Sequence, residues 1–111
     1  MVRVGQGLYG RIKFVDGTMP EYDRTYLVVS VSPESIGILN VSSAIGKAAK
    51  LLFTTNKYIK KHFPPFPKKS FVKLDSLVYV SVSEVSSMHI LANGDILDQA
   101  EMGSILKAIG I

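Results

Sequence analysis

Cysteine is absent from this sequence of 111 residues, so disulfide bonds, thiolate zinc sites and cysteine nucleophiles are excluded. The absence also suits a reducing compartment. No apolar run approaches the roughly 18 residues of a membrane-spanning helix, and the first residues lack the continuous apolar segment of a secretory signal. We therefore expect a cytoplasmic protein that has no membrane partner.

Motifs that hold a metal ion or a nucleotide are missing as well. The sequence contains no HExxH pair, no paired carboxylates, no glycine-rich phosphate loop and no nucleophile elbow. These absences remove the support for metalloenzymes and for nucleotide-dependent enzymes. We expect neither a metal ion nor a cofactor.

Acidic residues are missing between Glu34 and Asp75, although this stretch carries eight of the thirteen basic residues of a chain with net charge +4. The eight are Lys47, Lys50, Lys57, Lys60, Lys61, Lys68, Lys69 and Lys73, and the aromatic residues among them are Phe53, Tyr58, Phe63, Phe66 and Phe71. Lysines on one surface attract a polyanion, and aromatic faces stack bases for about 1–3 kcal/mol per base. The alternative is that the lysines are only solvated and the aromatic residues form the core. The lack of compensating acids favours an anionic partner.

The composition, with 47% apolar and 20% charged residues, is typical of a globular protein, and the length predicts one domain over 1–111. Alternating apolar residues and turn signals predict strands over 8–15, 24–32, 36–43 and, long or bent, 70–82. A short helical turn is predicted at 48–52. An Asn93-Gly94 turn lies between apolar flanks, and it predicts a further hairpin if these flanks pair with each other.

The C-terminal segment has the signature of a capped amphipathic helix. Asp98 is placed as N-cap with Glu101 three residues on, and an apolar stripe follows, so the helix is predicted from Gln99 to about Ala108. Together, these elements predict a mainly β (α+β) fold. Its expected architecture is a small SH3-like barrel of five to seven antiparallel strands with a C-terminal helix.

Arg24 begins one predicted strand and the pair Ser42 and Ser43 ends the next. If the two strands are antiparallel neighbours, Arg24 and Ser42 lie at the same edge of the sheet. A guanidinium neutralises the charge of a phosphate and a hydroxyl donates a hydrogen bond to it, so the pair suits a scissile phosphate. The alternative is that Arg24 merely flanks a core strand and the serines merely end one.

Several segments, taken in order, resemble motifs of the MazF/PemK family of toxins from bacterial toxin–antitoxin systems. The segments are Gly10 to Ile12, Arg24 to Ser30, Ile38 to Ser43, Ser70 to Asp75, and Leu97-Asp98 with the apolar helix after it. The resemblance covers roughly residues 8–110. Thr25 stands where the family usually has a proline.

This resemblance implies a metal-independent endoribonuclease that cleaves single-stranded RNA by attack of the 2′-hydroxyl on the adjacent phosphate. The catalytic residues that it implies are Arg24 for the charge of the transition state, Ser42 for a hydrogen bond to the phosphate, and Asp75 as the base. Lys73 and Asp75 match groove residues of some members, and on a regular strand they point to one face. The alternative for these two residues is an ordinary surface pair.

The predicted RNA-binding residues are Lys73, Ser43, Lys57, Lys60 and Lys61. The resemblance also implies a homodimer and an acidic antitoxin protein as inhibitor. Two other readings of the same barrel stay open: a non-catalytic nucleic-acid-binding accessory protein and a gyrase-directed toxin. The absence of tryptophan counts against the gyrase-directed toxin, because that kind acts through a C-terminal end that contains tryptophan.

Overall fold

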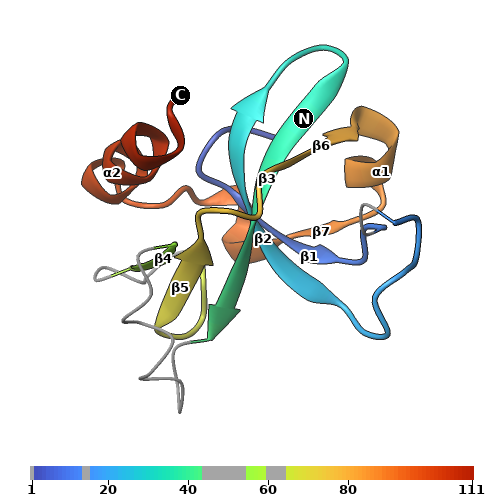
Figure 1. Ribbon diagram of the computed structural model, residues 1–111, viewed down its shortest axis with the longest axis horizontal. Helices are drawn as coiled ribbons and strands as arrows, with labels where there is room; N and C mark the ends of the chain where they lie inside the picture. The colour runs from blue at the N-terminus through green and yellow to red at the C-terminus, as the bar shows by residue number, and fades with distance from the viewer. Residues whose placement is uncertain (1, 14–15, 44–54, 60–64) are drawn as a thin grey trace.

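The computed structural model describes residues 2–13, 16–43, 55–59 and 65–111 (Figure 1). In this part of the chain, seven strands form one antiparallel sheet, in the order β4-β5-β3-β2-β1-β7 with β6 also paired to β3. The strands are β1 (Gly7–Gly10), β2 (Arg24–Val31), β3 (Ser35–Ser43), β4 (Asn56–Tyr58), β5 (Ser70–Lys73), β6 (Val78–Ser81) and β7 (His89–Ile90). The sheet twists strongly and does not close, because β4 and β7 lie at its two ends. The predicted class, mainly β with a C-terminal helix, is confirmed.

The strands predicted over 24–32 and 36–43 are β2 and β3, and they form an antiparallel hairpin at the centre of the sheet. Its register pairs Thr25 with Val41 and Tyr26 with Asn40, and it shifts once between Val28 and Ser30. Both faces of this hairpin are covered, since its side chains alternate between two apolar clusters. Buried faces on both sides explain why apolar residues run almost continuously through both strands.

The prediction of one long or bent strand over 70–82 is wrong, because this segment forms two separate strands, β5 and β6. Both of its parts pair with β3, but the chain leaves the ladder after Lys73, forms a turn at 74–75, and resumes as β6. The Ser76 hydroxyl stabilises this break: it donates to the Lys73 carbonyl (2.6 Å) and accepts from the Asn40 amide (2.7 Å). After β6, the short helix α1 (Val82–Ser86) begins at Ser81, whose hydroxyl accepts from the Glu84 amide.

The predicted hairpin around Asn93-Gly94 is also wrong. The residues before the turn, β7, pair with β1, and Ile96 after it bridges to Gln6, so both flanks pair with the N-terminal segment. Between them lies the 3-10 helix η2 (Leu91–Gly94). The two flanks serve different clusters, because Ile90 packs against one and Leu97 lies in the other. Pairing with a distant edge therefore replaces the local hairpin.

The predicted C-terminal helix is confirmed as α2 (Gln99–Ile109). The Asp98 carboxylate caps it by accepting from the amides of Ala100 (3.1 Å) and Glu101 (3.2 Å). Its Met102 and Ile105 side chains are buried in one of the two clusters. None of the helices in the described ranges has the length and apolar character needed to cross a membrane.

Two further predictions concern segments that the structure describes only in part or not at all. β1 ends at Gly10, so the strand predicted over 8–15 is shorter, and residues 14–15 lie outside the described ranges. The helical turn predicted at 48–52 also lies outside them.

Candidate functional site

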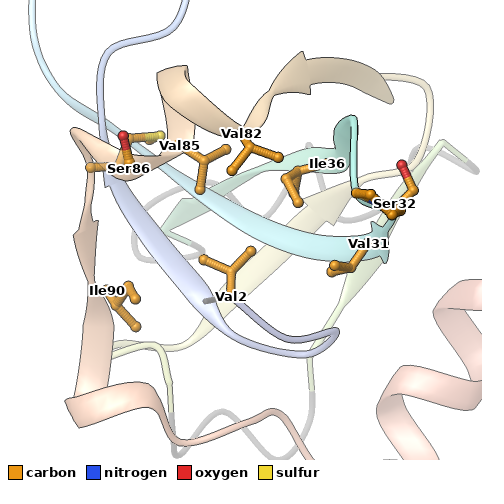
Figure 2. Close-up of a pocket in the computed structure, with 10 residues that line it drawn as sticks. Val2, Val31, Ser32, Ile36, Val82, Val85, Ser86 and Ile90 are labelled. Carbon is orange, nitrogen blue, oxygen red and sulfur yellow. The ribbon is translucent and has the colours of Figure 1, made fainter.

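An apolar hollow lies beside α1 and has a volume of about 320 Å³. Figure 2 shows that its labelled side chains come from the N-terminal segment, β2 and the turn after it, β3, α1 and β7. No charged residue is among the described residues that line it, and its polar side chains are the hydroxyls of Ser32 and Ser86. This chemistry suits an apolar group, and it gives no attraction for a polyanion.

A second hollow, which we call the cationic hollow, lies at the end of the hairpin where β2 begins. Its volume is about 230 Å³, and the described residues that line it are Ile12, Lys13, Arg24, Tyr26, Asn40, Lys73, Ser76 and Val78. Three of these side chains are cationic and none is a carboxylate. Cations gathered in a cleft attract anions and raise their local concentration. The cationic hollow is therefore suited to a phosphate.

An adjoining hollow, the serine hollow, also has a volume of about 230 Å³, and it shares Arg24 and Asn40 with the cationic hollow. Its described lining is Tyr22, Asp23, Arg24, Thr25, Asn40, Val41, Ser42 and Ser43. The prediction that Arg24 and Ser42 lie at one edge is confirmed, because the pairing of Thr25 with Val41 places them opposite each other. The two hollows together bring hydroxyls to the side of a cationic cleft.

Two tyrosines lie beside Arg24. The guanidinium carbon of Arg24 is 5.4 Å from the centre of the exposed Tyr22 ring, a cation–π contact that restrains the arginine. Tyr26, two residues along the strand, is 6% exposed and lines the cationic hollow. Burial raises the pKa of the Tyr26 hydroxyl, and the charge of Arg24 only partly offsets this. The hydroxyl therefore stays protonated at neutral pH and is able to donate a hydrogen bond.

Lys73, the last residue of β5, also lines the cationic hollow. The register of β3 and β5 pairs Val41 with Val72, which puts Lys73 next to Asn40 and on the same face as Arg24. The structure thus brings Lys73, which the sequence analysis named as an RNA-binding residue, close to Arg24, which it named as catalytic, although the two are far apart in the chain.

Asp75 is not part of this arrangement. It is exposed in the turn that follows β5, and it is among the described lining residues of neither hollow. The argument that it shares a face with Lys73 is wrong, since that argument needs a regular strand. Asp23 instead brings a carboxylate to the serine hollow, where its Oδ1 lies 3.2 Å from Nε of Arg11.

The remaining predicted residues are divided between the two faces of the sheet. Ser43 lines the serine hollow, and it also lines a hollow of about 330 Å³ that includes Tyr9 and Lys68. Lys57 pairs with Val72, so strand alternation places it on the face opposite Lys73. Lys60 and Lys61 lie outside the described residues.

Sequence reasoning missed several residues that line the cationic and serine hollows. They are Lys13, Tyr22, Asp23, Tyr26, Asn40 and Ser76. A signal existed for two of them: Tyr26 lies two residues from Arg24, and Asn40 two residues from Ser42, so alternation along a strand assigns all four to one face. Lys13 and Ser76 reach the site through tertiary structure, for which the sequence holds no local signal.

Comparison with models of known protein families gives no match, and comparison with curated protein sequences gives none either. In the described part of the chain, no group of three or more histidine, cysteine or acidic residues is arranged to hold a metal ion. The fold and the site define a small antiparallel sheet protein with a cation-lined hollow at the end of its central hairpin.

Proposed function

We propose that the protein is an endoribonuclease of the MazF/PemK toxin kind that cleaves single-stranded RNA without a metal ion. The observation that carries this proposal is the position of Arg24, which lines a hollow with Lys13 and Lys73 and lies opposite Ser42 at the hairpin edge. A phosphate in this hollow meets positive charge from three side chains, and hydroxyls lie beside it. That combination is what attack on a phosphodiester needs.

The proposed reaction is a transesterification within the RNA chain. The 2′-oxygen gives its proton to a base and forms a bond to phosphorus, the bond from phosphorus to the 5′-oxygen breaks, and this oxygen takes a proton from water. The products carry a cyclic phosphate and a free 5′-hydroxyl. Arg24 neutralises the additional charge on the phosphorane, and Ser42 donates a hydrogen bond to one of its oxygens. Tyr26, which is protonated at neutral pH, supplies a further donor from the same face.

The base that accepts the proton of the 2′-hydroxyl is assigned by comparing two carboxylates. The resemblance implies Asp75, whereas Asp23 lines the serine hollow together with Arg24 and Ser42. We expect Asp23→Asn to lower the cleavage rate at least about tenfold, because asparagine keeps an oxygen that orients the hydroxyl but does not accept its proton. We expect Asp75→Asn, in an exposed turn, to change the rate by no more than a few-fold.

The test uses a labelled single-stranded RNA in EDTA, with gel analysis of the rate and of the phosphate left on each product. Cleavage that needs a divalent metal ion, or products without a cyclic phosphate, would contradict the proposal. A larger loss in Asp75→Asn than in Asp23→Asn would assign the base to Asp75. Binding of RNA by a folded protein that never cuts it would favour the non-catalytic accessory protein, which the same cationic hollow also suits.

The proposed partners are a second copy of the chain and an acidic antitoxin. A single sheet of this size offers only short hollows, and a two-fold axis would extend them into a longer groove. An acidic segment would compete with RNA for the cations of the same hollow. We expect light scattering at tens of micromolar to give the mass of a dimer, and a monomer at that concentration would contradict this part of the proposal.

A further inference from the structure

Tyr22 presents an exposed aromatic ring at the side of the serine hollow. It lies in the loop that leads into β2, and it is 62% exposed. Arg24 lies over one face of the ring, with its guanidinium carbon 5.4 Å from the ring centre. A tyrosine covered on both faces would not reach this exposure, so the second face of the Tyr22 ring is open to solvent.

Packing within the protein does not account for this ring. Tyr22 belongs to neither of the two apolar clusters, so its ring adds nothing to the core. Proteins bind single-stranded nucleic acids by combining a cationic groove for the backbone with aromatic side chains on which bases stack. The cationic hollow supplies the first of these features, and the open face of Tyr22 supplies the second.

The ring also lies next to the place where we expect a phosphate. Arg24 lines both the cationic and the serine hollow, and Tyr22 lines the serine hollow. A phosphate oxygen that accepts a hydrogen bond from a guanidinium lies about 2.8 Å from its nitrogen. Since the same guanidinium contacts the ring, a phosphate on Arg24 and a base on Tyr22 are within the reach of one nucleotide.

We infer that the open face of the Tyr22 ring stacks on a base next to the phosphate that Arg24 binds. This inference rests on the proposed function, which makes single-stranded RNA the ligand. The guanidinium, the tyrosine ring and the base then form one stack, in which Arg24 covers one face of the ring and the base covers the other. Every base has a flat face, so this contact adds affinity for any sequence without reading the base edges.

The experiment compares ligands that differ in whether they carry a base: ribose 5-phosphate, adenosine 5′-monophosphate and adenosine 3′-monophosphate. The two adenosine monophosphates represent the nucleotides on either side of a phosphate in RNA. Affinities for the wild type are measured by NMR titration at one salt concentration. We expect at least one adenosine monophosphate to bind about fivefold or more tightly than ribose 5-phosphate, which corresponds to the lower end of base–aromatic stacking.

Three variants test whether this affinity ratio comes from the ring of Tyr22. Tyr22→Leu removes the ring, and the ratio should fall below about twofold; a weaker restraint on Arg24 affects every phosphate ligand alike and cancels in the ratio. Tyr22→Phe keeps the ring and should keep the ratio. Tyr79→Leu removes a similarly exposed tyrosine (58%) that is not among the described residues lining either hollow, and it should also keep the ratio. Melting curves show that each variant is folded.

The outcomes separate this inference from the proposed function. Equal affinity of the wild type for all three ligands, a ratio that survives in Tyr22→Leu, or an equal loss in Tyr79→Leu would overturn the stacking role of Tyr22, whether or not the protein cuts RNA. A ratio that depends on the Tyr22 ring in a protein that never cuts RNA would uphold the inference and remove the nuclease. Binding of none of the three ligands would remove the anion site, and both proposals with it.

Discussion

Replacing Arg24 with alanine is expected to lower the rate of single-stranded RNA cleavage by at least about a hundredfold, the usual effect of losing one preorganised contact to developing charge. Arg24, the first residue of β2, lines both the cationic and the serine hollow, and it lies opposite Ser42. Its guanidinium is held beside the Tyr22 ring, so little reorganisation is needed when a phosphate arrives. The rate is measured in EDTA with a labelled oligonucleotide.

Two other variants make this result specific. Arg3→Ala removes an exposed arginine that is not among the described residues lining either hollow, and it should leave the rate unchanged. Arg24→Lys keeps the charge but loses the planar fork of donors, so its rate should fall between those of the wild type and Arg24→Ala. An Arg24→Ala protein that is folded and cleaves at the wild-type rate would remove Arg24 from the mechanism.

The parts of the fold that could be predicted from the sequence are those with local causes. The β2–β3 hairpin follows from two apolar runs at hairpin distance, and α2 follows from the Asp98 cap and the stripe that contains Met102 and Ile105. In both cases, the residues that determine the structure are neighbours in the chain. The edge shared by Arg24 and Ser42 was predictable for the same reason.

The predictions that failed depend on partners distant in the chain. The turn after Lys73 could not be predicted from the sequence, because apolar residues continue on both sides of it. The Ser76 hydroxyl that stabilises this turn accepts a hydrogen bond from the backbone amide of Asn40, which lies on another strand. Asn93-Gly94 predicts a local hairpin, but Gln6 bridges to Ile96 and donates from its side chain to the Gly94 carbonyl (3.0 Å). No pattern within a single segment reports such pairings.

The residues of the candidate site also divide into those that local sequence signals predict and those that depend on distant parts of the chain. Arg24, Ser42 and Lys73 were predictable because each lies on a strand in a recognisable motif. Asp75 was implied by the resemblance, and its expected face was taken from the alternation of β5 extended beyond the point where that strand ends. Asn40 was predictable from alternation as a member of the face, but the burial of its side-chain oxygen was not, since that depends on the surrounding strands.

The second large effect is expected in the affinity for single-stranded RNA, because the lysines lie on different faces of the sheet. Lys13 and Lys73 line the cationic hollow with Arg24, whereas alternation places Lys57 on the opposite face. Hydrogen bonds to charged groups contribute about 1.5–3 kcal/mol, so each lysine that contacts a phosphate should account for roughly tenfold or more in affinity. We expect the double variant Lys13→Gln and Lys73→Gln to bind single-stranded RNA at least about a hundredfold more weakly.

The salt dependence of binding distinguishes direct phosphate contacts from a general effect of charge. Each lysine that contacts a phosphate of single-stranded RNA should make the slope of log affinity against log salt shallower by about 0.7, so the double variant should lose about 1.4. Lys57→Gln, a matched removal of one positive charge, should leave the slope unchanged if RNA follows the face that carries Arg24. An equal change for Lys57 would mean that the RNA contacts both faces, as the acid-free stretch from Lys47 to Lys73 suggests when the sequence is considered alone. Slopes that do not change in any variant would leave these lysines as solvated surface charges, and the cationic hollow would not be the RNA site.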